Sequence, residues 1–492
     1  MPSKHKPLRG QRWGDYGILL LISLLTMLIC TKSSPLYPLN DWVDSNAIFT
    51  VGKSILHGKV IYRDLFDHKG PILHFIHALG ALISFKTFFG VWLLQVVACF
   101  FFLLCSYRTL LLFTDRRAII VMPVYAVIVY CSRSLCQGDS AEEFCLPLVM
   151  YAIYVIVKSL KEQKPISRKE LFCVGITSAV ILWIKYTMLG LYIGWILLPF
   201  ILAVREKKWT YIRDIFLFVM AGVLLVSLAV ISYFLANGAV GDLFYTYFYS
   251  NMTQYQSGQP MSLGFILIII YAIYQNLPVW LCFLVGCIWL LIKRRWLITI
   301  QLLLTAGVGL LFTYFRFTVY SLTYYAFIFS GFSLFGFIAF YSMAKKLVSK
   351  LKPGVYACIL GLCCLLILPS CYLLSSNSSS LLVPKEELPQ YQFAEIINQT
   401  PNATVLNYNA MDMGVYTVTG IVPEYRYFCA MNLDAPKISK EQYNLVEAGA
   451  VDFIVTKETP LTTELYELRK TVTYPSGSRG HEYYLYERKA EN

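Results

Sequence analysis

The chain has 492 residues, of which 57% are hydrophobic and only 14% are charged, and its formal net charge is +13. This composition is typical of an integral membrane protein and excludes an ordinary soluble domain. The positive charge lies mostly in short clusters between apolar segments. Membrane topology explains such clusters, so we expect no nucleic-acid partner.

Apolar segments recur from the amino terminus to about residue 375. Crossing a hydrocarbon core ~30 Å thick takes about 20 helical residues, and on this basis we predict about eleven transmembrane helices. The predicted spans lie near residues 15–31, 88–113, 118–132, 143–159, 170–184, 187–204, 213–236, 263–292, 296–315, 321–343 and 354–375.

Lysine and arginine clusters occur at every second connection between these spans, beginning with Lys4 to Arg12. Cytoplasmic loops are enriched in these residues. We therefore expect a protein of the inner or plasma membrane with its amino terminus in the cytoplasm and its carboxyl terminus outside. The first apolar run lacks a small-residue cleavage site, so we expect it to remain as a span.

The first outward loop, residues 32–87, is charged, with four aspartates between Asp41 and Asp67. Apolar residues at helical spacing follow Asp44, and Gly58 is a stop signal, which together predict a short amphipathic helix at the membrane interface. Pro71 is suited to the first turn of a second helix, which we expect to run to about Phe85.

Beyond Cys371 the composition changes. A serine-rich linker leads to helical and strand patterns, with a helix at 391–398 and strands at 404–408, 453–457 and 483–488. We predict a small extracytoplasmic α/β domain at 376–492, after a transmembrane domain at 1–375.

One series of residues in the first outward loop has no obvious structural role. It consists of Asp44-Ser45, Phe49, Gly52 and Gly58, then Tyr62-Arg63-Asp64, then Phe66-Asp67-His68-Lys69-Gly70-Pro71. This run resembles the first outward loop of bacterial GT-C glycosyltransferases. The resemblance is to the branch that includes protein O-mannosyltransferases and the lipid A aminoarabinose transferase. The topology extends the similarity loosely to the whole chain.

The resemblance implies an all-α, GT-C-like polytopic fold and an inverting glycosyltransferase. Such an enzyme takes a hexosyl or pentosyl group from a polyprenyl-phosphate carrier, such as undecaprenyl phosphate. It transfers the sugar to an acceptor outside the cytoplasm, which can be a cell-envelope glycan, a lipid or a protein. Its partners are therefore the lipid-linked donor, the membrane lipid and this acceptor.

In this family the catalytic base is an aspartate at the start of the first interfacial helix, which corresponds to Asp44. A carboxylate can take the proton of the attacking hydroxyl. The departing lipid phosphate is a stable anion that needs nearby positive charge. Lys69 and Arg63 are our candidates for that charge, and Asp64 for a substrate contact. The alternatives are that Asp44 only caps its helix, that Asp64 only pairs with Arg63, and that Lys69 only anchors its segment at the membrane interface.

A divalent cation, Mg²⁺ or Mn²⁺, is another way to offset the phosphate charge. The candidate ligands are Asp67, Glu142 and Glu143, because Gly138 to Phe144 resembles an acidic turn of the same family. Salt bridging to Lys69 is the alternative for Asp67. Ser140 and Glu143 also have the spacing of a capping box, which does not use Glu142.

Two cations lie at the ends of predicted spans, Lys185 and Arg316. A cation at that depth is costly unless it is paired or its ammonium or guanidinium reaches the interface. Both are candidates to bind the lipid phosphate, with snorkelling as the alternative.

Two other classes of function stay open. A polysaccharide polymerase or ligase would more typically carry its functional loop late in the chain. A transporter or lipid flippase would have ionisable residues at mid-span and broken helices in paired repeats. The cysteines show no metal-binding spacing, although Cys131 and Cys136 flank a turn and could form a disulfide.

Overall fold

The computed structural model describes residues 9–254, 263–314, 322–433, 435–476 and 479–490. They fall into two compact units. The first consists of residues 1–31, 95–227 and 258–378, and the second of residues 32–94, 228–257 and 379–492. The charged first loop therefore groups with the carboxyl-terminal residues, whereas the sequence-based division placed it with the membrane helices.

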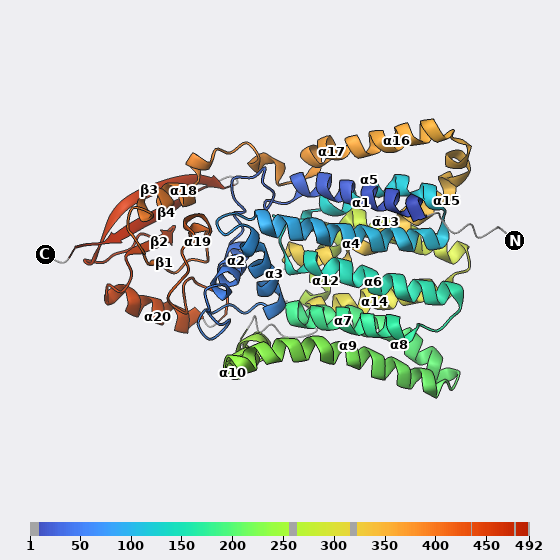
Figure 1. The fold of residues 1–492 in the computed structure, drawn as a ribbon, viewed down its shortest axis with the longest axis horizontal. Coiled ribbons are helices and arrows are strands. Elements are labelled where there is room, and N and C mark those ends of the chain that lie inside the picture. The colour runs from blue at the N-terminus through green and yellow to red at the C-terminus, as the bar shows by residue number, and fades with distance from the viewer. Residues whose placement is uncertain (1–8, 255–262, 315–321, 434, 477–478, 491–492) are drawn as a thin grey trace. The chain divides into compact units, whose positions relative to one another are not determined.

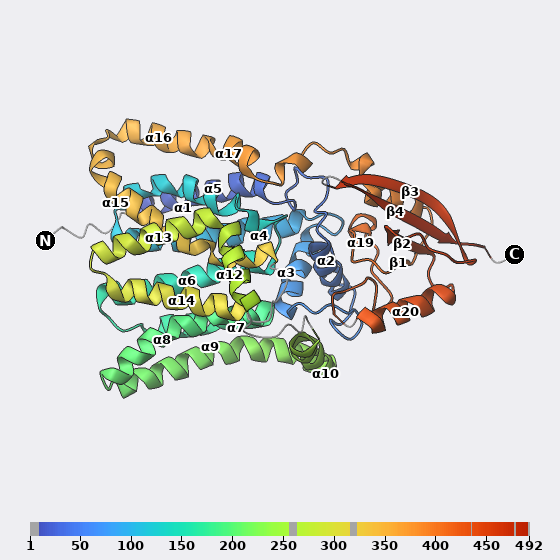
Figure 2. The same cartoon turned by 180° about the vertical axis from the view of Figure 1, so that it is seen from behind.

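The first unit is built from long apolar helices that run side by side (Figures 1 and 2). Most of these helices are hydrophobic all round, as expected of helices buried in lipid or in one another. They are α1 (Arg9–Cys30), α4 (Phe89–Phe113), α5 (Met122–Tyr130), α6 (Ala141–Glu162), α7 (Arg168–Lys185), α8 (Leu189–Arg205), α9 (Trp209–Ala236), α12 (Leu263–Gln275), α13 (Leu277–Ile292), α14 (Trp296–Tyr314), α15 (Leu334–Lys350), α16 (Pro353–Leu365) and α17 (Ile367–Leu374). Residues 89–94 of α4 and 228–236 of α9 belong to the second unit.

Eight stretches of the described chain are long and apolar enough to cross a membrane, or nine if the bent pair α12 and α13 is one crossing. One of the eight covers residues 168–205, which the structure divides into α7 and α8 by a short 3₁₀ turn at Tyr186–Met188. The predicted span at 118–132 consists of a 3₁₀ turn, Arg116–Val121, and the nine-residue α5, each shorter than a crossing. The predicted class, a polytopic all-α membrane protein with a small carboxyl-terminal α/β domain, is confirmed.

Glycines bring several of these helices into backbone contact. A Cβ added at Gly194 of α8 would lie 2.5 Å from the carbonyl oxygen of Leu304 in α14. Likewise, a Cβ at Gly336 of α15 would lie 2.4 Å from the carbonyl oxygen of Cys282 in α13. Small residues let the helix backbones approach closely. This close packing promotes helix association in a membrane, where the hydrophobic effect contributes little because the lipid is itself apolar.

In the second unit, the first loop forms the two helices that the sequence predicted. Helix α2 (Val43–Ile55) is followed by Gly58, whose φ of +78° is favourable for glycine, and α3 (Pro71–Ile83) begins with its proline. The helices touch at Gly52, where an added Cβ would lie 2.8 Å from the backbone nitrogen of Ala78. This close packing of α2 against α3 restricts the position of the segment that connects them, residues 56–70.

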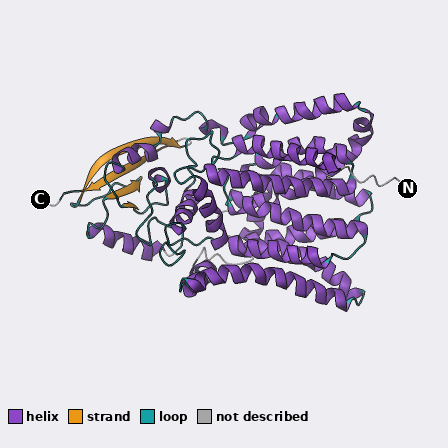
Figure 3. Ribbon diagram, in the orientation of Figure 1, coloured by secondary structure: helices purple, strands orange, loops and turns teal. Residues whose placement is uncertain are grey.

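The carboxyl-terminal part of the second unit contains the strands of the described chain (Figure 3). They are β1 (Val405–Asn407), β2 (Phe453–Lys457), β3 (Tyr466–Ser476) and β4 (Arg479–Arg488), in the order β1-β2-β4-β3. Strands β1 and β2 are parallel and the other pairs are antiparallel. The helices α18 (Pro389–Ile397), α19 (Val415–Thr419) and α20 (Ala435–Glu447) complete this part. The predicted helix and three predicted strands are present, and β3 is an additional strand.

The predicted aromatic loop is partly helical. Residues Val240–Leu243 form α10, a π-helical segment covers Phe244–Ser250, and Asn251–Thr253 forms α11. Residues 255–262 lie outside the described chain.

Candidate active site

Asp44 lies in the first turn of α2, at a position that does not cap the helix. Trp42 occupies the N-cap, and no side chain makes a capping hydrogen bond there. The alternative that Asp44 is only a cap is therefore not realised. The positive end of the helix dipole still favours a carboxylate in this turn.

Lys69 joins Asp44 to Asp67. Its Nζ atom lies 3.0 Å from Oδ1 of Asp44 and 3.6 Å from Oδ1 of Asp67. The side chains of Asp44 and Lys69 are 17% and 16% exposed, and that of Asp67 is fully buried. The structure thus brings together three of the predicted residues, from α2 and from the segment that leads into α3. We refer to them as the Asp44–Lys69–Asp67 cluster.

Asp67 is a buried anion. Burial raises its pKa, but the positive charges of Lys69, His74 and His68 outweigh this, and the pKa falls to about 2. The backbone N–H of Lys69 donates to Oδ1 at 3.0 Å, whereas Oδ2 is buried and accepts no hydrogen bond from the described residues. Burial lowers the pKa of the neighbouring His74 to about 4, so this imidazole is neutral at pH 7. At neutral pH the nearest counter-charge of Asp67 is therefore the ammonium of Lys69 at 3.6 Å, and the imidazole of His68 lies 3.8 Å from the same carboxylate oxygen.

Contacts with Tyr62 and with residues far away in the sequence hold the segment that carries Lys69. The hydroxyl of Tyr62 donates to the carbonyl oxygen of Lys69 at 2.5 Å, and the Tyr62 ring stacks on Phe234. Asn251 donates to the carbonyl oxygen of His68 at 2.7 Å. Tyr62 adopts a φ of +70°, a strained backbone conformation for a bulky residue. Such strain is often found beside functional sites.

Sequence reasoning assigned no role to Tyr62 or Asn251. The only signal for Tyr62 was its place beside Arg63 and Asp64 in the run that carries the family resemblance. Nothing in the local sequence pointed to Asn251, because its partner precedes it by well over a hundred residues.

Arg63 and Asp64 pair with each other. The Nε of Arg63 lies 2.8 Å from Oδ1 of Asp64, and Nη1 donates to the carbonyl oxygen of Asn237 at 2.7 Å. Asp64 also accepts a hydrogen bond from the backbone N–H of Val60. These contacts agree with the alternative in which Asp64 only forms a salt bridge with Arg63. The roles of both residues in substrate binding stay predictions.

A second ion pair, in the first unit, joins two other predicted residues. The Nζ of Lys185 lies 2.5 Å from Oε1 of the buried Glu142, and 3.2 Å from the ring centroid of Tyr325. Lys185 is therefore paired with a carboxylate and an aromatic ring, which is one of the ways to hold a cation at this depth. Arg316 lies outside the described residues.

Glu143 forms hydrogen bonds at the start of α6. Its backbone N–H donates to the hydroxyl of Ser140 at 3.2 Å, as the capping-box spacing predicts. Its carboxylate accepts hydrogen bonds from the backbone N–H of Asp139 at 2.7 Å and from Gln95 at 2.9 Å. Glu143 thus stabilises the turn before the helix, and its role as a metal ligand stays a prediction, as do those of Asp67 and Glu142.

Cys131 and Cys136 do not form a disulfide, and all described cysteines are free thiols. The sulfur of Cys131 lies instead 3.6 Å from that of Cys30.

No protein-family model matches the chain, and no curated protein sequence matches it. Its fold is similar to that of solved membrane-protein structures. The similar solved structures include two of ArnT from Cupriavidus metallidurans. The structure with bound undecaprenyl phosphate is 11% identical, with a TM-score of 0.56, over 95% of this chain and 98% of that one. The apo structure is 12% identical, with a TM-score of 0.57, over 97% and 98%. The resemblance to the lipid A aminoarabinose transferase branch is confirmed for the fold.

Proposed function

We propose that this protein is an inverting glycosyltransferase that moves a sugar from a polyprenyl-phosphate carrier to an acceptor outside the cytoplasm. The observation that carries the proposal is the Asp44–Lys69–Asp67 cluster at the start of α2. The ArnT-like fold supports it, since one of the ArnT structures holds undecaprenyl phosphate.

The proposed chemistry needs one base and nearby positive charge. Asp44 takes the proton from the acceptor hydroxyl as its oxygen forms a bond to the anomeric carbon. The bond between that carbon and the phosphate oxygen breaks, and the polyprenyl phosphate leaves with the electron pair. Attack opposite the leaving group inverts the anomeric centre. Lys69 offsets the negative charge that develops on the phosphate.

Lys69 is shared by two carboxylates, so the cluster carries a net charge of −1. A lipid phosphate that approaches Lys69 therefore also meets the repulsion of Asp44 and Asp67. When the phosphate competes for the ammonium, Asp44 loses part of its counter-charge and becomes a stronger base. Donor binding would thus activate the base.

The net negative charge also supports a role for a divalent cation. Asp67 would hold it, because its Oδ2 atom is buried and accepts no hydrogen bond from the described residues. Glu142 is paired with Lys185, as Asp67 is with Lys69, and Glu143 accepts two hydrogen bonds on one carboxylate oxygen while its other oxygen accepts none from the described residues, so both stay candidates for this role. Such a cation would supply charge that stabilises the departing phosphate.

The test is sugar transfer by purified protein in lipid nanodiscs, supplied with a panel of undecaprenyl-phosphate hexoses and aminopentoses and with envelope lipid as acceptor. Asp44→Asn should lower the rate by about 10²- to 10⁴-fold, the usual contribution of a general base. Chelation with EDTA in the same assay tests the divalent cation, since transfer should fall and then return when Mg²⁺ or Mn²⁺ is added.

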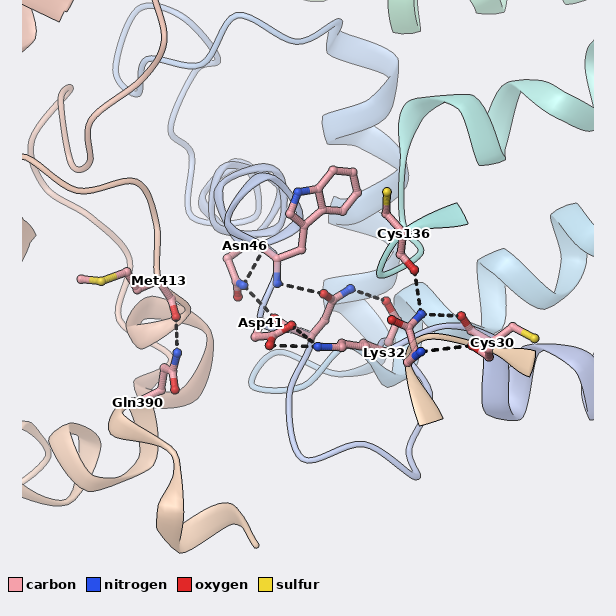
Figure 4. A network of polar contacts seen from close by, with 12 residues as sticks. Cys30, Lys32, Asp41, Asn46, Cys136, Gln390 and Met413 are labelled. Atoms are coloured by element: carbon pink, nitrogen blue, oxygen red, sulfur yellow. Dashed lines mark hydrogen bonds and ion pairs between the residues drawn. The ribbon is translucent and has the colours of Figure 1, made fainter. Parts of the chain in front are cut away.

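Asp41→Asn is the matched control. Asp41 lies in the same loop and also pairs with a lysine, Lys32, at 2.8 Å (Figure 4). It is 42% exposed, so the loss of its ion pair should change the rate little. Undiminished transfer by Asp44→Asn would remove Asp44 as the base. Transfer from none of the donors by the unaltered protein would count against the proposed function.

A further inference from the structure

Three cysteines that are far apart in the sequence meet in the first unit. Cys30 is the last residue of α1, and Cys131 directly follows α5. Cys371 lies in the second half of the eight-residue α17. Their sulfur atoms all lie within 4.8 Å of one another. In the described part of the chain this is the one group of three or more metal-ligating side chains that gather so closely. We call it the three-cysteine cluster.

The spacing of the sulfurs suits a bound metal ion. Sulfurs that each bind one ion at about 2.3 Å lie about 3.8 to 4.0 Å apart in tetrahedral or trigonal geometry. The Cys30 and Cys131 sulfurs are 3.6 Å apart, and the third is within 4.8 Å of both. An ion could therefore bind with small shifts of each side chain.

The backbone around the cluster favours a cation. Cys30 and Cys131 lie at the carboxyl ends of their helices, and Cys371 is close to the end of α17. The negative ends of three helix dipoles therefore lie near the cluster. In addition, Asn377 donates hydrogen bonds to the carbonyl oxygens of Cys30 at 2.8 Å and Cys136 at 2.7 Å (Figure 4). These bonds join the segment that follows Cys371 to the end of α1 and to the turn that follows Cys131.

We propose that Cys30, Cys131 and Cys371 bind one soft monovalent cation of the Cu(I) type. Thiolate ligands select soft metal ions. Zn²⁺ takes four ligands in almost all structural sites, whereas the cluster offers three sulfurs, and those of Cys30 and Cys371 belong to fully buried residues. Cu(I) is stable with three sulfur ligands. Binding changes no oxidation state, and each thiol that becomes a thiolate releases its proton to water.

The bound ion would act as a clamp. It would join the ends of α1, α5 and α17, which belong to the beginning, the first third and the last quarter of the chain. Because the ion binds the folded arrangement only, it should stabilise the protein by mass action. The alternative is that the three thiols serve only as small apolar side chains, which free cysteines often do.

The experiment uses the full-length protein in detergent, reduced and free of oxygen, with Cu(I) supplied from its bicinchoninate complex. We expect one Cu(I) bound per chain, and a higher melting temperature when it is bound. Cys30→Ser, Cys131→Ser and Cys371→Ser should each weaken Cu(I) binding at least tenfold and abolish the increase in melting temperature. Ag(I), which is inert to oxidation in air, should stabilise the protein in the same way.

Cys145→Ser is the matched control, because Cys145 is also a buried thiol of the first unit but lies outside the cluster. It should keep Cu(I) binding intact. The melting temperatures of the metal-free variants show whether each has folded, and Cys371→Ala provides a second, less polar change at a buried position. Cu(I) binding that is equal in the unaltered protein and the three variants would overturn the proposal. A Cys30–Cys131 disulfide in the protein isolated without reductant, with no Cu(I) binding after reduction, would also overturn it.

Discussion

At the scale of single residues, Lys69 is the charge on which the candidate site depends. Its ammonium is the nearest counter-charge of the buried Asp67, and it also pairs with Asp44. A buried carboxylate without a partner is strongly unfavourable. Lys69 therefore has two separable roles. It is the counter-ion of Asp67 and, in our proposal, it also offsets the negative charge of the donor phosphate.

Lys69→Met should separate these roles when it is combined with Asp67→Asn. The single variant leaves an uncompensated buried charge and should destabilise the protein by about 3 to 5 kcal/mol. The double variant should recover most of this loss, because the amide that replaces the carboxylate carries no charge. Thermal unfolding in detergent measures both.

Sugar transfer should remain low in the single and the double variant, since neither has the Lys69 ammonium that offsets the phosphate charge, and the double variant also lacks Asp67 as a cation ligand. Recovery of transfer in the double variant would show instead that Lys69 serves only to neutralise Asp67.

At the scale of elements, α2 is held by the carboxyl-terminal residues of its own unit. The Nζ of Lys53 donates to the carbonyl oxygen of Tyr416 at 2.6 Å, and the hydroxyl of Thr50 donates to Asp412 at 2.6 Å. Lys53 and Asp412 are fully buried. The helix whose first turn carries the candidate base is thus positioned by carboxyl-terminal residues whose sequence contains no catalytic motif.

This contact predicts a dependence of stability on pH. Burial lowers the pKa of Lys53, Asp412 opposes this and the nearby Lys86 adds to it, so that the pKa falls from 10.5 to about 7. Between about pH 7 and pH 10.5 the unfolded chain binds a proton at Lys53 that the folded protein does not, so stability should rise with pH across this window. Burial also raises the pKa of Asp412, but that group titrates at lower pH.

Lys53→Met should reduce the increase in melting temperature across this pH window, relative to the unaltered protein. Lys59→Met, in the turn after α2, is the control and should leave the increase unchanged. Equal slopes for Lys53→Met and the unaltered protein would mean that Lys53 is charged in the folded state.

The strand β3 shows why one element escaped sequence-based prediction. It pairs with β4 alone, at the edge of the sheet, and a register shift interrupts it between Leu468 and Lys470. Its segment includes Glu467, Arg469 and Lys470, so it lacks the apolar run of β2. Charged residues and bulges are common on edge strands because they discourage pairing with other chains. Only the pairing with β4 identifies this segment as a strand.

At the scale of the whole molecule, the orientation in the membrane rests on the basic clusters. Opposite sides for the two termini require an odd number of crossings. If α7 and α8 each cross, and if the 3₁₀ turn at Arg116–Val121 crosses together with α5, the nine crossings become the predicted eleven. The predicted topology is therefore compatible with the described helices.

Reporter fusions test this topology. Alkaline phosphatase fused after residue 492 should be active, and green fluorescent protein at the same place should be dark, because the carboxyl terminus is expected outside. Fusions within residues 163–167 should give the opposite result. Active phosphatase at 163–167 would contradict the orientation, and the proposed reaction would then lie on the cytoplasmic side.

By itself, the sequence determined the membrane class, the fold class, and the two helices of the first loop. These properties follow from local signals: apolar runs of membrane length, helical periodicity, and the glycine and proline at helix ends. The sequence also selected Asp44, Asp67 and Lys69 as candidates, although it did not show their distances.

Only the tertiary structure decided which side chains meet. It paired Lys185 with Glu142, Arg63 with Asp64, and Lys69 with two aspartates, and it brought three cysteines together from distant helices. The physical reason is that a local pattern fixes which face of an element is buried, whereas a contact also needs the position of its partner. That position results from the packing of the whole chain, as the joining of α2 to Asp412 and Tyr416 illustrates.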